Sequence, residues 1–242
     1  SFFLLLAGVR FSGCIPIRLK NLRWNRERFR EIAGGGLPSL FRQGLGSVAA
    51  MTLNIAANPY GDAAIAAMSV VSRIFMFAIS ALIGFGQGFQ PVCGFNYGAK
   101  KYGRVREAFW FCVKVSTVFL LALAILGFLL SGHLIGIFRD DPEVIGIGTV
   151  AVRFQCATLL LNGWIVMNNM MTQTMGKTFY ASLLASARQG LFFIPILWIL
   201  PRIFGLAGIQ SAQAAADVFA FLLSVFLYRK VSAELKKEEQ TI

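Results

Sequence analysis

The stretch GFGQGFQPVCGFNYGAKKYGRVREA, residues 84–108, is the most informative part of the sequence for predicting the fold. It follows a long apolar run and ends in basic residues at positions 100, 101, 104 and 106. Because lysine and arginine collect in the cytoplasmic loops of membrane proteins, this change predicts the cytoplasmic end of a transmembrane helix. Proline removes a helical hydrogen bond, so Gly84, Gly86, Gly88 and Pro91 predict a deformable helix end that serves as a hinge or gate.

The composition argues against a soluble protein. Hydrophobic residue types make up 57% of the 242 residues and charged types only 14%, against about 25% charged residues in soluble domains. The net charge of +12 comes from basic clusters that lie between long uncharged runs. A nucleic-acid-binding protein needs a basic face on a soluble fold, so we expect a lipid bilayer as the partner and no nucleic acid.

Six runs are long enough to cross a bilayer, which takes about 20 mainly apolar residues. They cover residues 37–57, 63–84, 108–130, 144–171, 181–200 and 206–228. The predicted fold class is all-α, a polytopic membrane protein with a six-transmembrane-helix bundle. The apolar residues 2–9 are too few to cross. We expect them to end a preceding span, which makes the chain the C-terminal part of a longer protein.

The basic residues predict the orientation. They gather in the segment 18–30, in the loop 100–106, at Lys177 and in the tail 229–237, whereas the alternate loops carry only Arg139 and Arg202. The positive-inside rule places the four basic segments in the cytoplasm, together with both ends of the chain. We expect the membrane to be a plasma membrane. Residues 18–31 predict an amphipathic helix on the inner leaflet, with a calmodulin-like partner as the alternative.

Polar side chains within the spans form two stripes. One comprises Gln43, Ser47 and Asn54, and the other comprises Gln155, Asn162, Asn169 and Gln173. The members of each stripe share one helix face. Together they predict a water-accessible cavity between helices, with Met51, Met170 and Met171 as adaptable apolar contacts. The alternative is that these amides hydrogen-bond between helices and have no role in transport.

Asp217 is the only carboxylate well inside a predicted span. A buried carboxylate can carry H⁺ or Na⁺ in exchange for a substrate. It can equally form a fixed ion pair, for which the spans offer Arg188, Arg153 and Arg73. The sequence leaves both roles open.

No pattern of residues indicates an enzyme or a bound metal. The four cysteines, at positions 14, 93, 112 and 156, have no metal or redox spacing, and His133 has no His or Cys neighbour. The glycines from position 84 are not followed by the Gly-Lys-Ser/Thr of a phosphate-binding loop. We therefore expect no catalytic site, metal or cofactor.

Four segments carry a resemblance to a known family. QPVCGFNYGAKKYGRVREA, residues 90–108, resembles a signature of the MATE (multidrug and toxic compound extrusion) transporters, of the MOP flippase superfamily. GLPSLFRQGLGSV, residues 36–48, is similar to the start of that family's seventh helix. Residues 173–201 resemble its tenth-to-eleventh helix connection, and residues 208–223 resemble its twelfth helix.

The resemblance implies a twelve-helix fold of two six-helix lobes. Residues 37–228 would be helices 7–12 of the C-terminal lobe, and residues 1–9 the end of helix 6. Residues 10–36 would be the cytoplasmic inter-lobe linker, and residues 229–242 the cytoplasmic tail. The N-terminal lobe would be a missing partner. Some members carry acids on helices seven and ten, but neither predicted span does here, so coupling would depend on the missing lobe or on Asp217.

The function implied is a secondary antiporter that exports cationic drugs or toxic organic compounds in exchange for H⁺ or Na⁺. The predicted substrate cavity comprises Gln43, Ser47, Met51, Asn54, Asn162, Asn169 and Gln173. The alternative is a lipid or polysaccharide-precursor flippase of the same superfamily. A flippase needs a more cationic cavity, for which Arg42, Arg73 and Arg153 are the candidates.

Overall fold

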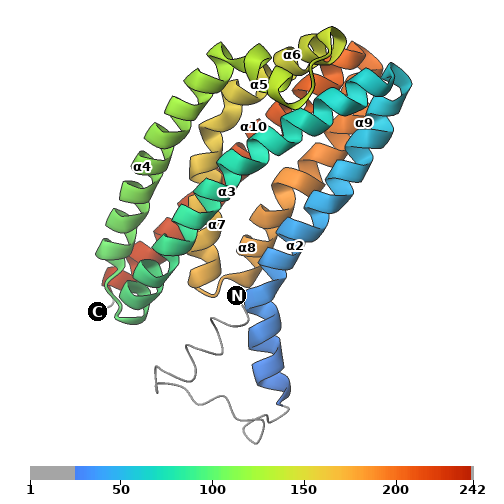
Figure 1. The fold of residues 1–242 in the computed structure, drawn as a ribbon. Helices are drawn as coiled ribbons and strands as arrows, with labels where there is room; N and C mark the ends of the chain where they lie inside the picture. Colours follow the sequence, from blue (N-terminus) through green and yellow to red (C-terminus); the bar gives the residue numbers. More distant parts are fainter. Residues whose placement is uncertain (1–24, 241–242) are drawn as a thin grey trace, which may run out of the picture. The chain divides into compact units, whose positions relative to one another are not determined.

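The structure is a computed structural model, and it describes residues 25–240. These residues form helices joined by short turns, with no strand among them (Figure 1). The α-helices are α2 (Arg26–Ala57), α3 (Asp62–Gly98), α4 (Tyr102–Leu129), α5 (Ser131–Phe138), α6 (Pro142–Leu159), α7 (Leu161–Thr174), α8 (Thr178–Ser186), α9 (Phe193–Phe204) and α10 (Leu206–Gln240). A 3₁₀ turn, η2 (Asn58–Tyr60), follows α2, and a π-helix, η3 (Ala187–Phe192), joins α8 to α9. The predicted all-α class is confirmed.

The chain divides into two compact units, residues 1–34 and 35–242. In the first unit the described part is helical from Arg26 onward, inside the predicted linker 10–36. The predictions for residues 1–9 and for the linker up to residue 24 concern positions outside the described residues. The second unit contains the rest of α2, residues 35–57, and every other helix.

Four helical segments of the described chain are long and apolar enough to cross a membrane. They are α3, α4, the segment Thr178–Phe204 and α10 up to Glu239; three of them contain a predicted span, and α4 covers all but the last residue of the span 108–130. The predicted span 144–171 corresponds to α6 and α7, which bend by 54° at Leu160 and would make a fifth span if the pair is counted as one. The predicted span 37–57 lies in α2, which is not among these helices because polar residues such as Arg42, Gln43 and Asn54 lower its hydropathy.

Local sequence explains several helix ends. α6 begins where the Asp141 side chain accepts a hydrogen bond from the Glu143 amide and Pro142 occupies the first helical position. α7 and α9 are followed by Gly176 and Gly205, whose φ angles of +72° and +58° are left-handed conformations that glycine adopts without strain. The predicted hinge lies inside α3, which continues through Pro91 to Gly98.

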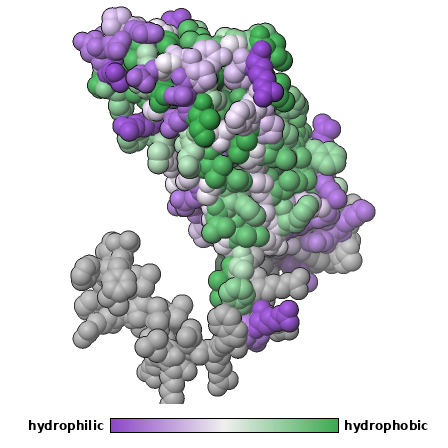
Figure 2. All heavy atoms as spheres, turned by 90° about the vertical axis from the view of Figure 1, so that its right-hand side faces the viewer, coloured by the Kyte–Doolittle hydropathy of each residue, from purple (hydrophilic) through white to green (hydrophobic). Residues whose placement is uncertain are grey.

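The helices of the second unit pack into one bundle. α3 contacts α4, α6 and α7, and α10 contacts α6, α7 and α9. Close approach depends on small residues, since a Cβ added to Gly86 would lie 3.2 Å from the Met170 side chain and one added to Gly163 would lie 3.0 Å from Ser116 Oγ. Many large hydrophobic side chains remain exposed, and Figure 2 shows a mainly hydrophobic face with hydrophilic side chains toward its ends. Such a surface suits acyl chains better than water.

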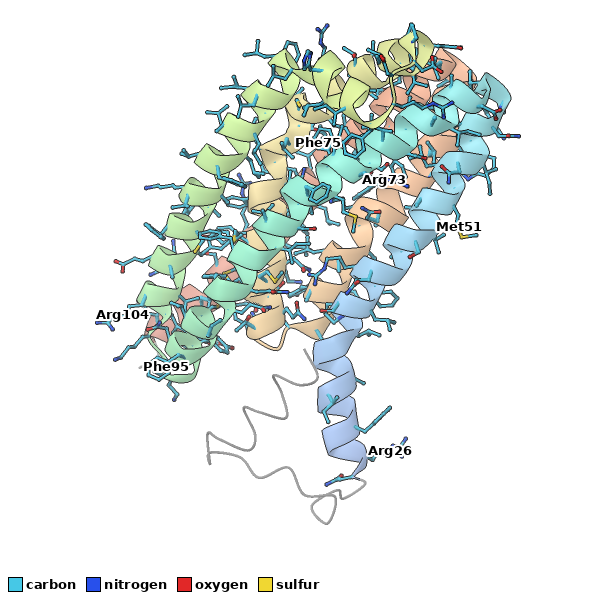
Figure 3. All side chains as sticks on the ribbon, in the orientation of Figure 1. Arg26, Met51, Arg73, Phe75, Phe95 and Arg104 are labelled. Atoms are coloured by element: carbon cyan, nitrogen blue, oxygen red, sulfur yellow. The ribbon has the colours of Figure 1, made fainter. Side chains whose placement is uncertain are left out.

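The last turns of α10 pack against the end of the bundle that contains Arg106 and Lys177. We call residues 229–240 the α10 tail. Its Glu234 pairs with Lys177, and its Glu239 accepts a hydrogen bond of 2.7 Å from Arg106. Leu235 is 1% exposed. Arg104 lies at the same end of the bundle as Phe95 (Figure 3). The tail therefore ties α4 and the α7–α8 turn together at this end.

Candidate functional site

A buried polar cluster surrounds Asp217 of α10, which is 3% exposed. Its Oδ1 accepts hydrogen bonds from Arg188 Nε at 2.7 Å and from Gln213 Nε2 at 3.0 Å. Its Oδ2 accepts a third hydrogen bond from Asn162 Nδ2 at 2.9 Å. Three elements, α7, η3 and α10, thus converge on one carboxylate, and both of its oxygens have donors. This geometry favours the fixed ion pair over an ion-carrying group.

The partner of Asp217 is Arg188, and not Arg153 or Arg73. Arg73 is exposed on α3 (Figure 3). Arg153 on α6 is also exposed, and its guanidinium carbon lies 5.2 Å from the centre of the Phe128 ring. Sequence distance gave no reason to prefer Arg188, because the choice depends on how α10 packs against η3.

The π-helix positions Arg188. A π-helix has a wider turn than an α-helix and is frequent at functional sites. Here η3 also packs closely against α2, because a Cβ on Gly190 would lie only 2.8 Å from Leu45 Cδ1. Glycine at this position therefore permits the contact between α2 and η3. The ion pair and this close approach together fix η3 between two helices.

The polar stripe of the fourth predicted span is buried between helices. Asn169 Nδ2 donates to the Ala181 carbonyl at 2.7 Å, and Gln173 Nε2 donates to Ser39 Oγ at 3.3 Å. Gln155 is also buried, on the other side of the bend at Leu160. In the described chain Asn169 and Gln173 thus make hydrogen bonds between helices.

The site prediction omitted two amides that make similar contacts. Asn168 Nδ2 donates to Ser224 Oγ at 2.9 Å and to the Ser224 carbonyl at 2.8 Å. Gln210 Nε2 donates to the Ile147 carbonyl at 2.8 Å. Both are visible in the sequence as amides within apolar runs, but neither falls on a predicted stripe.

The polar stripe of α2 is exposed instead of buried. Gln43, Ser47 and Asn54 are exposed, and so is Met51, of which 66% is accessible. Figure 3 shows Met51 pointing away from the bundle. Met170 and Met171, by contrast, are each 1% exposed in the core. The two predicted stripes therefore do not meet in one cavity within the described chain.

Of the predicted hinge residues, three are exposed and one is buried. Gly84, Gly88 and Pro91 are exposed on α3, and nothing lies within 4 Å of a Cβ added to either glycine. Gly86 is buried against Met170. One face of α3 around the hinge is thus free of contacts in this chain, whereas the other is packed.

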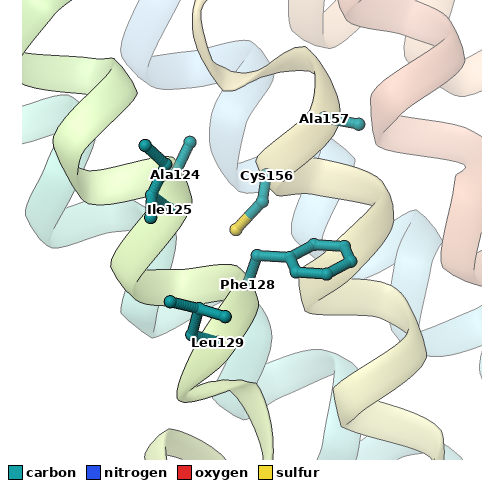
Figure 4. A pocket seen from close by; sticks show the side chains of 6 residues that line it. All are labelled: Ala124, Ile125, Phe128, Leu129, Cys156 and Ala157. Carbon is teal, nitrogen blue, oxygen red and sulfur yellow. The ribbon is translucent and has the colours of Figure 1, made fainter.

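An apolar recess of about 290 Å³ opens between α4 and α6. It is lined by Ala124, Ile125, Phe128, Leu129, Cys156 and Ala157 (Figure 4). None of the predicted cavity residues lines it. Within residues 25–240, no three His, Cys, Asp or Glu side chains lie close enough together to hold a metal ion.

Comparison with known proteins assigns this helical bundle to a family. The family model described as MatE matches residues 38–199, which is more than half of the chain. This chain belongs to the MatE family. The multidrug export protein MepA of Staphylococcus aureus (strain N315) is 27% identical over 232 residues, which are 95% of this chain and 51% of MepA. MepA of Staphylococcus saprophyticus is 28% identical over the same shares of both chains.

A solved structure has the same arrangement of helices. The crystal structure of MATE in the bent conformation matches with a TM-score of 0.87 at 22% identity, over 98% of this chain and 54% of that one. The chain therefore has the fold of half a MATE transporter. Its family and its long apolar helices indicate an integral membrane protein. It spans about half the length of the relatives it matches.

Proposed function

We propose that this MatE chain forms the C-terminal lobe of a secondary antiporter that exports cationic organic compounds in exchange for H⁺ or Na⁺. The observation that carries the proposal is the exposed face of α2, with Gln43, Ser47, Asn54 and Met51. Polar groups within a membrane usually face a cavity or a partner. A second lobe opposite this face would enclose them. The similarity to MepA, a multidrug export protein, supports the same function.

In this proposal the substrate binds near the bilayer midplane between the two lobes, as in other transporters built from repeats. The amides and hydroxyl of α2 would hydrogen-bond the substrate, and Met51 would adapt its flexible side chain to varied apolar groups. Gly84, Gly88 and Pro91 of α3 would absorb the change of helix shape when the lobes rock, because their exposed side is free of contacts.

We propose that Asp217 has a structural role and that the coupling ion binds in the other lobe. A cation at Asp217 would have to compete with the Arg188 guanidinium 2.7 Å away. Protonation would leave that guanidinium without its counter-charge. The ion pair is therefore better suited to holding η3 in place than to releasing an ion in each cycle.

The domain boundaries and orientation belong to the same proposal. Residues 37–228 would form the lobe, residues 1–9 the end of helix 6, residues 10–36 the inter-lobe linker and residues 229–242 the cytoplasmic tail. Both ends would lie in the cytoplasm, below a plasma membrane. The flippase is less favoured, because one of its three candidate arginines, Arg153, lies over Phe128 beside an apolar recess, and because Gln43, Ser47 and Asn54 on the exposed face of α2 are neutral.

The test is efflux of a cationic dye by the complete protein in vesicles, with H⁺ and Na⁺ gradients imposed separately. We expect one of the two gradients to drive efflux, and Asn54→Ala to reduce it. The matched control is Asn58→Ala, which changes an exposed amide in η2 outside the proposed cavity. Absence of efflux under both gradients would refute antiport. Equal effects of the two variants would refute the assignment of the α2 face.

A further inference from the structure

The apolar recess between α4 and α6 results from small side chains on both helices. Ala124 and Ala157 line it, and the helices approach so closely that a Cβ on Gly127 would lie 2.9 Å from Cys156 Sγ. Phe128 and Leu129 extend beyond these small residues and form the wall toward the end of α4. The result is an open groove whose lining is almost entirely apolar (Figure 4).

The groove opens onto a surface suited to lipid chains. Of its lining side chains Ile125 (51%) and Leu129 (72%) are exposed, and α6 also exposes Val150 (41%) and Phe154 (41%). Both helices belong to segments long and apolar enough to cross a membrane, α6 as part of the bent pair. In a bilayer, an exposed apolar face of this kind suits acyl chains, and the groove can hold one of them.

Arg153 places a positive charge beside this groove. It lies about 16 Å beyond the start of α6, at a rise of 1.5 Å per residue, and its guanidinium lies over the Phe128 ring that also lines the recess. Within residues 25–240, no carboxylate forms an ion pair with it. A charge within a membrane-spanning segment is costly without a partner of opposite sign. The contact with Phe128 is attractive, but it does not neutralise the charge.

We propose that the groove and Arg153 together bind an anionic phospholipid. One acyl chain occupies the recess between Phe128 and Cys156, and the Arg153 guanidinium binds the phosphate of the headgroup. Guanidinium and phosphate pair through two parallel hydrogen bonds, and the contact with the Phe128 ring keeps the guanidinium beside the groove. Phe128 is the second-last residue of α4, so the guanidinium over its ring lies near that end of the helix, while the stem of the long side chain stays in the apolar region.

The test is lipid retention by the complete protein. The protein is equilibrated with vesicles of equimolar phosphatidylglycerol and phosphatidylcholine and extracted into detergent, and the retained lipids are counted by native mass spectrometry. We expect phosphatidylglycerol to be retained preferentially. Arg153→Gln should lower its retention about fivefold, the factor that corresponds to about 1 kcal/mol for one charge near an anionic headgroup. Arg153→Lys should keep most of it.

The groove itself is tested with the charge left in place. Ala157→Phe adds a ring to the lining of the recess and should lower phosphatidylglycerol retention, whereas Ala122→Phe adds the same ring at an exposed position of α4 that does not line the recess. Equal retention of the two lipids by the unmodified protein would overturn the proposal. Unchanged retention in both Arg153→Gln and Ala157→Phe would overturn it as well. Dye efflux does not enter the readout, so the result stands apart from that of the transport assay.

Discussion

Removing the positive charge of Arg188 tests whether the cluster around Asp217 is a structural ion pair. Breaking a buried pair from one side costs about 3–5 kcal/mol, because the remaining charge has no counter-charge. The side chains of Arg188 and Asp217 are 17% and 4% exposed, and Asn162 and Gln213 would still donate to the carboxylate. We therefore expect Arg188→Met to lower the free energy of unfolding by about 3 kcal/mol, the low end of this range.

The double variant Arg188→Met/Asp217→Leu separates charge from packing. It leaves no buried charge, so it should regain most of the stability that Arg188→Met loses. The free energy of unfolding of the unmodified protein, Arg188→Met and the double variant is measured in detergent micelles by circular dichroism. Arg229→Met changes an exposed arginine of α10 and should stay within about 0.5 kcal/mol of the unmodified protein. If Arg188→Met is as stable as this control, the reasoning from burial and charge is wrong.

The remaining predictions concern packing and the hinge. Asn168→Ala removes two buried hydrogen bonds to α10 and should lower the free energy of unfolding by about 1–3 kcal/mol; a loss no larger than that of Asn58→Ala would contradict this. Gly163→Ala places a Cβ 3.0 Å from a serine oxygen and should destabilise by about 1–3 kcal/mol, which thermal unfolding would detect. A Cβ added at Gly88 meets no atom within 4 Å, so Gly88→Ala should stabilise α3 by up to about 1 kcal/mol. The same variant should slow dye efflux, because the hinge must bend, and unchanged efflux would exclude this position from the hinge. Leu235→Ala should cost about 2–5 kcal/mol because the side chain is 1% exposed, and it should increase protease cleavage of the α10 tail; unchanged cleavage would show that the tail is held by its ion pairs alone.

The sequence by itself determined the helical class, the membrane location and the family. Runs of about 20 apolar residues have few stable structures other than helices in a bilayer, because the backbone must satisfy its own hydrogen bonds there. The signature at residues 90–108 was specific enough to predict the family that the MatE match shows. These properties depend on residue type along the chain and need no knowledge of contacts between distant residues.

Only the tertiary structure decided which polar residues meet. Asn162 and Asp217 are 55 positions apart in sequence, and their contact follows from the packing of α7 against α10. Periodicity predicted that Gln43, Ser47 and Asn54 share a face, but it does not say whether that face is buried or exposed. The apolar recess was not predicted, because alanine, phenylalanine and cysteine in apolar runs carry no signal of a recess until α4 and α6 lie side by side.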